Sequence, residues 1–259
     1  MIPAPSRLAA LGALCLALPA AGGEPAVAGA EIPQRIEVPG TGDDRITVDL
    51  YGPAAGAPAL VLIGHGFTRN RSNHAALARE LARAGFAVAV PELPHLADHA
   101  ANARSLGLVA DALSRASPGP RPGFGALPVI YAGFSAGGTA ALAAAVADPR
   151  ALGWIGLDPV DRGGLGAAAA SRLDHPAYVF HAPANRCNAQ WNAAAIVAGA
   201  RDVTATEVPF ASHCDFEGPT DALCELACGA PHPGRQAAIR TAVVEAAEAL
   251  VARGGRARP

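Results

Sequence analysis

Gly133-Phe134-Ser135-Ala136-Gly137 is the stretch that decides the fold of this chain. It follows an apolar run, residues 127–132, and opens into an alanine-rich segment, residues 138–147. A strand, Gly-x-Ser-x-Gly and a helix in that order are the context of a nucleophile elbow. The turn is so tight that bulky side chains flanking the serine would clash, hence the two glycines. The stretch therefore predicts a serine hydroxyl exposed at the end of a strand.

Outward from this stretch, apolar runs of strand length alternate with segments of helical periodicity. The expected strands are 35–38, 45–50, 59–63, 86–90, 127–132, 154–157, 177–181 and 203–208. The expected helices are 74–84, 100–114, 138–147 and 236–252. An initial hairpin followed by this alternation predicts the α/β class, with a doubly wound, mostly parallel sheet and helices on both faces. No repeat or linker divides the chain, so residues 31–259 are expected to form a single domain.

Composition excludes several classes of function. The chain has 259 residues, a formal net charge of −2, 51% hydrophobic residues and no lysine among its 20 basic residues. Without lysine there can be no Walker phosphate loop, pyridoxal Schiff base or lysine nucleophile. No basic patch invites nucleic acid. We expect no cofactor, no metal and no nucleic-acid partner, and we expect a monomer.

The first 30 residues have the pattern of a secretory signal peptide. Arg7 supplies a positive charge, residues 8–18 are apolar, and small residues follow, with plausible cleavage after Ala21, Ala28 or Ala30. The apolar part is too short to span a bilayer, and no other segment is long enough to do so. The mature chain is therefore expected to be secreted or periplasmic, without an integral membrane segment.

Four cysteines remain once the signal segment is removed, namely Cys187, Cys214, Cys224 and Cys228. An even number after export indicates two disulfides. In a helix, Cys224 and Cys228 would have β-carbons about 6 Å apart, whereas a disulfide requires about 3.5–4.5 Å. The preferred pairing therefore joins Cys187 to one of Cys224 and Cys228, and Cys214 to the other. Both arrangements of this kind remain open. A thiolate metal site is the alternative, although it lacks the usual CxxC spacing.

A serine that transfers an acyl group needs a base and an orienting carboxylate. After an elbow of this kind the acid and then the histidine follow in the chain. His213 lies five residues past the last expected strand, and the other histidines lie elsewhere. The loop at 182–188 contains no carboxylate, so we choose Asp158, which ends the neighbouring strand, and keep Asp161 as the alternative acid.

The oxyanion that forms during acyl transfer needs two N–H donors. One should be the amide of Ala136, directly after the serine. The second should come from the loop after the strand at 59–63, where Gly64-His65-Gly66-Phe67 offers the amide of Phe67. His65 is expected to be a structural hydrogen-bonding residue beneath this loop.

Residues 59–215 resemble the chlorophyllase branch of the α/β-hydrolases, and more loosely the cutinase and polyester-hydrolase branch. The resemblance is carried by His65-Gly66-Phe67, by the elbow at 133–138 and by Leu157-Asp158-Pro159-Val160-Asp161. It implies the α/β-hydrolase fold, ester hydrolysis and the aspartate of the Asp-Pro-Val segment as the acid. The family's elbow usually reads Gly-His-Ser-Arg-Gly-Gly. Phe134 and Ala136 depart from it, so chlorophyll is not implied as the substrate.

Together these features predict a secreted serine hydrolase that cleaves small-molecule or lipid-like esters through Ser135, His213 and Asp158. Two alternatives on the same scaffold are an acyltransferase and a non-catalytic binding protein. A third is a metal enzyme that uses the cluster His95, Asp98 and His99. Candidate walls of the substrate pocket are the aromatic residues Phe67, Phe134 and Trp191.

Overall fold

The structure is a computed structural model that describes residues 33–53, 55–115, 124 and 126–254. The expected signal segment, most of the stretch between the expected helix at 100–114 and the expected strand at 127–132, and the residues from 255 onward lie outside this part. No helix in the described part is long and apolar enough to cross a membrane.

Eight strands form one sheet in the order β1-β2-β4-β3-β5-β6-β7-β8. The pairs β1–β2 and β2–β4 are antiparallel, and the other neighbours are parallel. The sheet is therefore mostly parallel with an antiparallel hairpin at one edge, as the sequence predicts. The strands are β1 (Gln34–Pro39), β2 (Arg45–Tyr51), β3 (Leu60–Gly64), β4 (Ala87–Pro91), β5 (Val129–Phe134), β6 (Ala151–Leu157), β7 (Ala177–His181) and β8 (Val203–Glu207).

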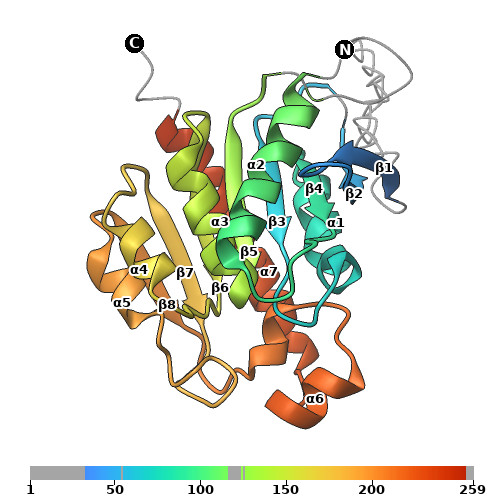
Figure 1. Cartoon of the computed structure of the whole chain (residues 1–259). Coiled ribbons are helices and arrows are strands. Elements are labelled where there is room, and N and C mark those ends of the chain that lie inside the picture. Colours follow the sequence, from blue (N-terminus) through green and yellow to red (C-terminus); the bar gives the residue numbers. More distant parts are fainter. Residues whose placement is uncertain (1–32, 54, 116–123, 125, 255–259) are drawn as a thin grey trace, which may run out of the picture.

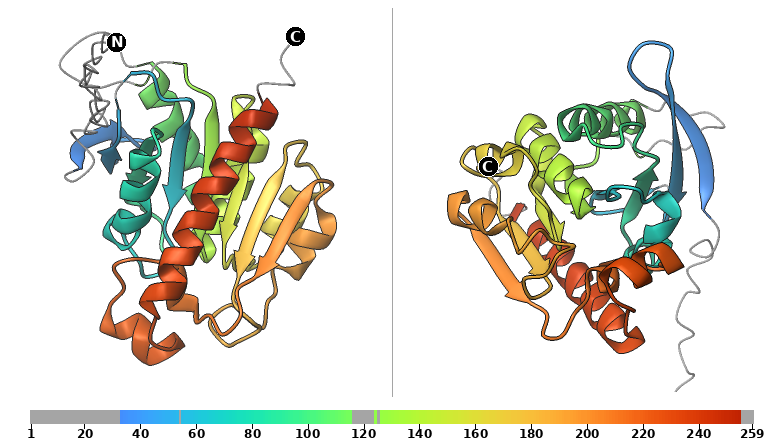
Figure 2. Two further views of the ribbon diagram at one scale, coloured as in Figure 1. Left: turned by 180° about the vertical axis from the view of Figure 1, so that it is seen from behind. Right: turned by 60° about the horizontal axis from the view of Figure 1, so that its bottom comes forward.

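Helices cover both faces of this sheet (Figures 1 and 2). On one face α2 contacts α3, α3 contacts α4, and α4 contacts α5, while α1 and α7 pack together on the other. The α-helices are α1 (Ala75–Arg83), α2 (His99–Ser114), α3 (Ala136–Ala147), α4 (Leu165–Ala170), α5 (Ala194–Gly199), α6 (Ala222–Cys228) and α7 (Pro233–Gly254), and the 3₁₀ turns are η1 (Arg71–His74) and η2 (His213–Phe216).

The central strands are apolar at every position because both of their faces are covered. In β3, Leu60 and Leu62 pack into the core beneath α2 and α3, whereas Val61 and Ile63 pack into the core beneath α1 and α7. This alternation follows from the two-residue period of a strand. The predicted strands of the sheet centre are confirmed, although β6 begins at Ala151, three residues earlier than expected.

Three short helices, α4, α5 and α6, were not predicted. Each has only six or seven residues, too few to show a helical repeat in the sequence. Two of them depend on contacts that form with the fold. Asp161 accepts hydrogen bonds from the first turn of α4, and Asp221 caps α6 by accepting from the amide of Cys224.

The parallel strands all point toward the lower edge of the sheet in Figure 1, where α6 lies. Ligand sites of open parallel sheets lie outside the carboxyl ends of the strands. The expected site residues all follow such strand ends, namely Phe67, Ser135, Asp158 and His213. The fold therefore brings the loops that carry them to one edge of the sheet.

Candidate active site

Ser135 occupies the turn between β5 and α3. Its backbone has φ 53° and ψ −126°, a conformation that non-glycine residues rarely adopt. A β-carbon on Gly133 would lie 2.3 Å from the carbonyl oxygen of Gly137, and one on Gly137 would lie 2.2 Å from that of His65. The two glycines of the motif are therefore required by backbone packing.

Asp158 and His213 meet although 55 residues separate them in the chain. The Asp158 Oδ2 atom lies 2.6 Å from His213 Nδ1, and the Asp158 side chain is fully buried. Its other oxygen, Oδ1, accepts from the amide of Ala182 at 3.1 Å and from Nδ2 of Asn188 at 3.2 Å. A proton on Nδ1 is held by the carboxylate, so Nε2 of the neutral ring is left without a proton and can act as a base.

The 3₁₀ turn η2, which carries His213, is held in place by Asp215, a residue that is almost completely buried. Its Oδ2 accepts from the amide of Ser212 at 2.7 Å and pairs with Nε of Arg235 at 2.9 Å. Oδ1 accepts from the amide of His232 at 2.6 Å. The position of the imidazole is thus tied to α7 through this carboxylate.

Phe134 lies between two imidazole rings. Its ring centroid is 4.5 Å from that of His213 and 5.8 Å from that of His74. His74 is fully buried, and neither of its ring nitrogens has a hydrogen-bond partner in the described part of the chain. Burial lowers the pKa of His74 to about 3, with smaller effects from His65 and Arg69, so the ring is neutral.

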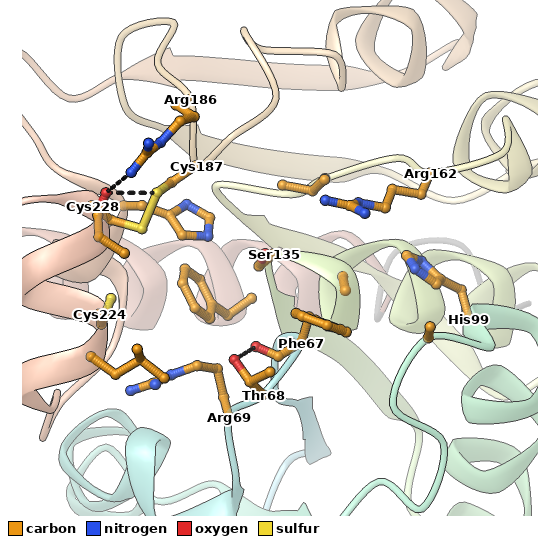
Figure 3. A pocket seen from close by; sticks show the side chains of 17 residues that line it. Phe67, Thr68, Arg69, His99, Ser135, Arg162, Arg186, Cys187, Cys224 and Cys228 are labelled. Atoms are coloured by element: carbon orange, nitrogen blue, oxygen red, sulfur yellow. Dashed lines mark hydrogen bonds between the residues drawn. A yellow bond between two sulfur atoms is a disulfide. The ribbon is translucent and has the colours of Figure 1, made fainter.

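Ser135 and His213 line one cleft with a volume of about 310 Å³ (Figure 3). Within the described residues, the hydroxyl of Ser135 makes no hydrogen bond, to His213 or to any other group. Catalytic hydrogen bonds are often long in ligand-free structures and shorten once substrate binds. The cleft is lined by Phe67, Thr68, Arg69, Ala97, His99, Phe134, Ser135, Ala136, Val160, Arg162, Arg186, Cys187, His213, Leu223, Cys224, Ala227 and Cys228.

The amides expected to bind an oxyanion belong to Phe67 and Ala136, which both line this cleft. Neither donates to a protein acceptor in the described part of the chain. A β-carbon on Gly66 would lie 3.0 Å from the β-carbon of Ser135, so the loop at 64–67 packs directly on the elbow. The geometry therefore leaves two free N–H groups close to the serine.

His65 anchors this loop. Its Nδ1 atom donates to the carbonyl oxygen of Gly66 at 3.0 Å, and Nε2 accepts from the amide of Leu93 at 2.9 Å. Burial lowers the pKa of His65. Since Nε2 accepts a hydrogen bond, we assign the neutral ring and read the 3.5 Å approach to Glu92 as a contact without charge pairing.

Asp161, the alternative acid, has a different set of partners. Its two carboxylate oxygens accept from the amides of Gly166 and Ala167, each at 2.9 Å. It therefore stabilises the start of α4, where the positive end of the helix favours a carboxylate. Among the described residues, Asp158 is the carboxylate that contacts the imidazole of His213.

The cysteines form two disulfides, Cys187–Cys228 and Cys214–Cys224. This pairing joins Cys187 and Cys214 each to one of the two cysteines in α6, as preferred from the helical spacing. In the described part of the chain, the one group of three potential metal ligands is Cys214, Cys224 and Cys228, and their sulfurs are already paired. His95, Asp98 and His99 form no such group there, and Asp98 instead caps α2.

Sequence reasoning missed Asn188, which is completely buried beside Asp158. Its Nδ2 group donates to Asp158 and to the carbonyl oxygens of Ala182 and Pro183, while Oδ1 accepts from the amides of Asn185 and Trp191. Asn188 thus fixes the carboxylate and the loop after β7 at once. The available signal was the position of Asn188 in the loop after β7, where many folds of this kind carry the carboxylate that orients the histidine.

Trp191 and Phe67, two of the expected pocket walls, have different surroundings. Phe67 lines the cleft and is about half exposed, at 49%. Trp191 stacks on His181 with ring centroids 3.7 Å apart and is not among the residues that line the cleft. One wall of the cleft is instead built by α6, which supplies Leu223 and Ala227.

No protein-family model matches the chain, and no curated protein matches it in sequence. Solved structures do resemble it. Dienelactone hydrolase from Anabaena variabilis is 25% identical, covers 75% of this chain and 95% of its own, and has a TM-score of 0.59. Est1E from Butyrivibrio proteoclasticus is 14% identical, with coverage of 82% and 98% and a TM-score of 0.60.

The esterase domain of a Rhodothermus marinus protein is 19% identical, covers 70% of this chain and 90% of its own, and has a TM-score of 0.55. None of these neighbours singles out the chlorophyllase-like branch. With its mostly parallel eight-stranded sheet, its covering helices and these neighbours, the chain has the α/β-hydrolase fold and belongs to the α/β-hydrolase superfamily.

Proposed function

We propose that the chain is a serine hydrolase that cleaves carboxylic esters, with Ser135 as nucleophile, His213 as base and Asp158 as orienting acid. The observation that carries the proposal is the 2.6 Å contact between His213 Nδ1 and Asp158 Oδ2, in a cleft that the elbow serine also lines. The hydrolase and esterase neighbours support the same reaction class.

The chemistry follows from these positions. The hydroxyl oxygen of Ser135 attacks the ester carbonyl carbon while Nε2 of His213 takes the hydroxyl proton. The carbonyl oxygen becomes an oxyanion, which the amides of Phe67 and Ala136 stabilise by hydrogen bonds. Collapse of the tetrahedral intermediate breaks the ester C–O bond, and the imidazolium returns the proton to the leaving alcohol. An acyl-enzyme remains on Ser135.

Deacylation repeats the sequence with water. Nε2 of His213 takes a proton from the water, whose oxygen attacks the acyl carbon. The second tetrahedral intermediate releases the carboxylic acid and restores the hydroxyl of Ser135. Throughout, Asp158 stabilises the imidazolium, and Asn188 and the amide of Ala182 hold the carboxylate in place.

A fluorophosphonate probe and an ester assay test this proposal together. The wild-type protein should form a phosphonyl adduct on Ser135 and hydrolyse 4-nitrophenyl butyrate, and Ser135→Ala should lose both. Ser171→Ala is the matched control, because Ser171 is exposed at the end of α4 and its hydroxyl bonds only to the carbonyl oxygen of Ala168. Ester turnover that survives in Ser135→Ala would refute the proposed nucleophile.

We also propose export, with residues 1–30 acting as a cleaved signal. The two disulfides support this because such bonds persist in oxidising compartments. Expression of the full chain in a bacterial host, followed by N-terminal sequencing of the periplasmic or secreted product, tests it. A product that keeps Met1 and stays with the cytosolic fraction would contradict the proposal.

A further inference from the structure

The cleft in front of Ser135 is electropositive. Three arginines line it, Arg69, Arg162 and Arg186, and no aspartate or glutamate is among the described residues that line it. Clefts that carry charge of one sign concentrate ligands of the opposite sign. The three guanidinium groups differ in the protein groups that they already contact, and this difference identifies the one whose N–H donors are available to a ligand.

Arg69 is neutralised. It makes a two-pronged pair with Glu217, at 2.9 and 2.6 Å, and approaches Asp221 at 3.0 Å. Its side chain is only 6% exposed. Arg186 is exposed and donates to the carbonyl oxygen of Ala227 at 3.0 Å, a contact that directs its guanidinium toward the disulfide wall (Figure 3).

Arg162 has no such partner among the residues that the structure describes. It follows β6 by five residues, and its side chain extends over the cleft on the opposite side of Ser135 from Arg186 (Figure 3). Among the described residues, no carboxylate forms an ion pair with it. Its neighbour Asp161 directs both carboxylate oxygens to the backbone of α4. The charge of Arg162 therefore remains available inside the cleft.

His99 lies on the same side of the cleft as Arg162 (Figure 3). Its residue exposure is only 9%, and its Nδ1 atom is enclosed without a hydrogen-bond partner. An enclosed donor without an acceptor is costly, so the proton of the neutral ring is expected on Nε2. Burial lowers the pKa of His99, the carboxylate of Asp161 opposes this shift, and Arg162 lowers the pKa by a smaller amount.

We propose that Arg162 and His99 form an anion subsite that selects esters bearing a carboxylate on the acyl or the alcohol group. The guanidinium supplies charge and paired N–H donors, which match the geometry of a carboxylate, and Nε2–H of His99 supplies a further donor. The proposal rests on the ester hydrolysis proposed above. The ligand class is a short ester, because the cleft measures about 310 Å³.

Two pairs of esters, matched in length and differing in one carboxylate, test the subsite in a pH-stat. Monoethyl glutarate against ethyl pentanoate reports on the acyl side, and 4-acetoxybutanoate against butyl acetate reports on the alcohol side. The variants are Arg162→Gln, Arg162→Lys and the control Arg172→Gln. Arg172 is also exposed but lies outside the cleft. Arg172→Gln therefore changes the net charge by the same amount as Arg162→Gln without altering the cleft.

In wild type, the charged member of at least one pair should have the higher kcat/KM. Arg162→Gln should lower kcat/KM for that member about tenfold, mainly through KM, and change the neutral member less than about twofold. Arg162→Lys should retain part of the preference and Arg172→Gln all of it. Equal losses for both members of each pair, or no loss in Arg162→Gln, would overturn the subsite.

A binding measurement separates this proposal from the proposed catalysis. Glutarate is titrated calorimetrically into wild type, Arg162→Gln and Arg172→Gln, none of which needs to turn over an ester for the result to be read. Binding that is lost only in Arg162→Gln supports the subsite even if no fluorophosphonate adduct forms on Ser135. Absence of glutarate binding by wild type, or equal binding by Arg162→Gln, overturns the subsite even if Ser135 proves catalytic.

Discussion

Replacing Asn188 by aspartate places a second carboxyl group beside Asp158 in a site without solvent. The asparagine Nδ2 atom is 3.2 Å from Asp158 Oδ1, and both residues are completely buried. Aspartate has almost the same shape and keeps the acceptor that binds the amides of Asn185 and Trp191. The substitution therefore changes the charge and the donor while leaving the packing of the loop in place.

Two limits give the size of the effect. If both carboxylates were ionised, charges about 3.2 Å apart would repel by about 5 kcal/mol at an effective dielectric constant of about 20. If one instead kept a proton, holding a carboxyl group protonated at pH 7 against an ordinary pKa of about 3.9 would cost about 4 kcal/mol. The cheaper route sets the expected loss in the free energy of unfolding, about 4 kcal/mol at pH 7.

The sign of the pH dependence follows from proton binding. A carboxyl whose pKa is raised in the folded protein binds a proton there before it does so in the unfolded chain. The deficit of Asn188→Asp relative to wild type should thus shrink by about 1.4 kcal/mol per pH unit between pH 7 and pH 5. Urea unfolding of both proteins at pH 5.0, 6.0 and 7.0 measures this slope.

Asn185→Asp is the matched control, since Asn185 lies in the same loop, is half-buried and bonds to no carboxylate in the described part of the chain. Its Oδ1 atom accepts from the amides of Cys187 and Asn188, and its Nδ2 group donates to the carbonyl oxygen of Pro183. Its deficit should be small and nearly independent of pH over this range. A pH-independent deficit in Asn188→Asp, or the same slope in both variants, would refute the reasoning about paired carboxyl groups.

Three further perturbations have definite expected outcomes. Gly137→Ala should lower the free energy of unfolding by more than about 3 kcal/mol in urea, since its β-carbon would lie 2.2 and 2.4 Å from two carbonyl oxygens. Gly107→Ala should raise it by about 0.5–1 kcal/mol, because that helical site is open; equal effects would contradict the packing argument. His74→Leu should gain about 2 kcal/mol over wild type between pH 7.5 and pH 5, because the buried ring, with its pKa near 3, stays neutral while the unfolded chain takes up a proton below pH 6.5. Parallel pH dependences would argue against a neutral buried ring. The double variant Cys214→Ser/Cys224→Ser should lose about 3 kcal/mol, since the bond closes a short loop, and an unchanged urea midpoint would show that α6 is held by other contacts.

The sheet centre was predictable because its signals are local. Residues of β3 and β5 are apolar at every position, and Gly133 is required by the carbonyl group of Gly137, four residues away in the same turn. The expectation that Asp158 and His213 meet came from strand order, together with the absence of a carboxylate after β7. In the structure their side chains are 2.6 Å apart.

Other features could not be predicted because they depend on segments that meet only in the folded chain. Asn188 contacts the carboxylate of Asp158, 30 residues away, and Arg69 pairs with Glu217, 148 residues away. No periodicity or motif in the sequence marks either contact. The disulfide partners illustrate the boundary. Helical spacing excluded a bond between Cys224 and Cys228, but which of them reaches Cys187 depends on the path of the loop after β7.

Both sulfur bridges fasten the same seven-residue helix, α6, which forms one wall of the cleft. The eight-stranded sheet contains neither bridge, so a preparation refolded without an oxidant can have normal circular dichroism and still lack a fixed wall beside the histidine. A normal secondary-structure content therefore does not show that the two disulfides have formed. A count of free thiols belongs with every activity measurement made on it.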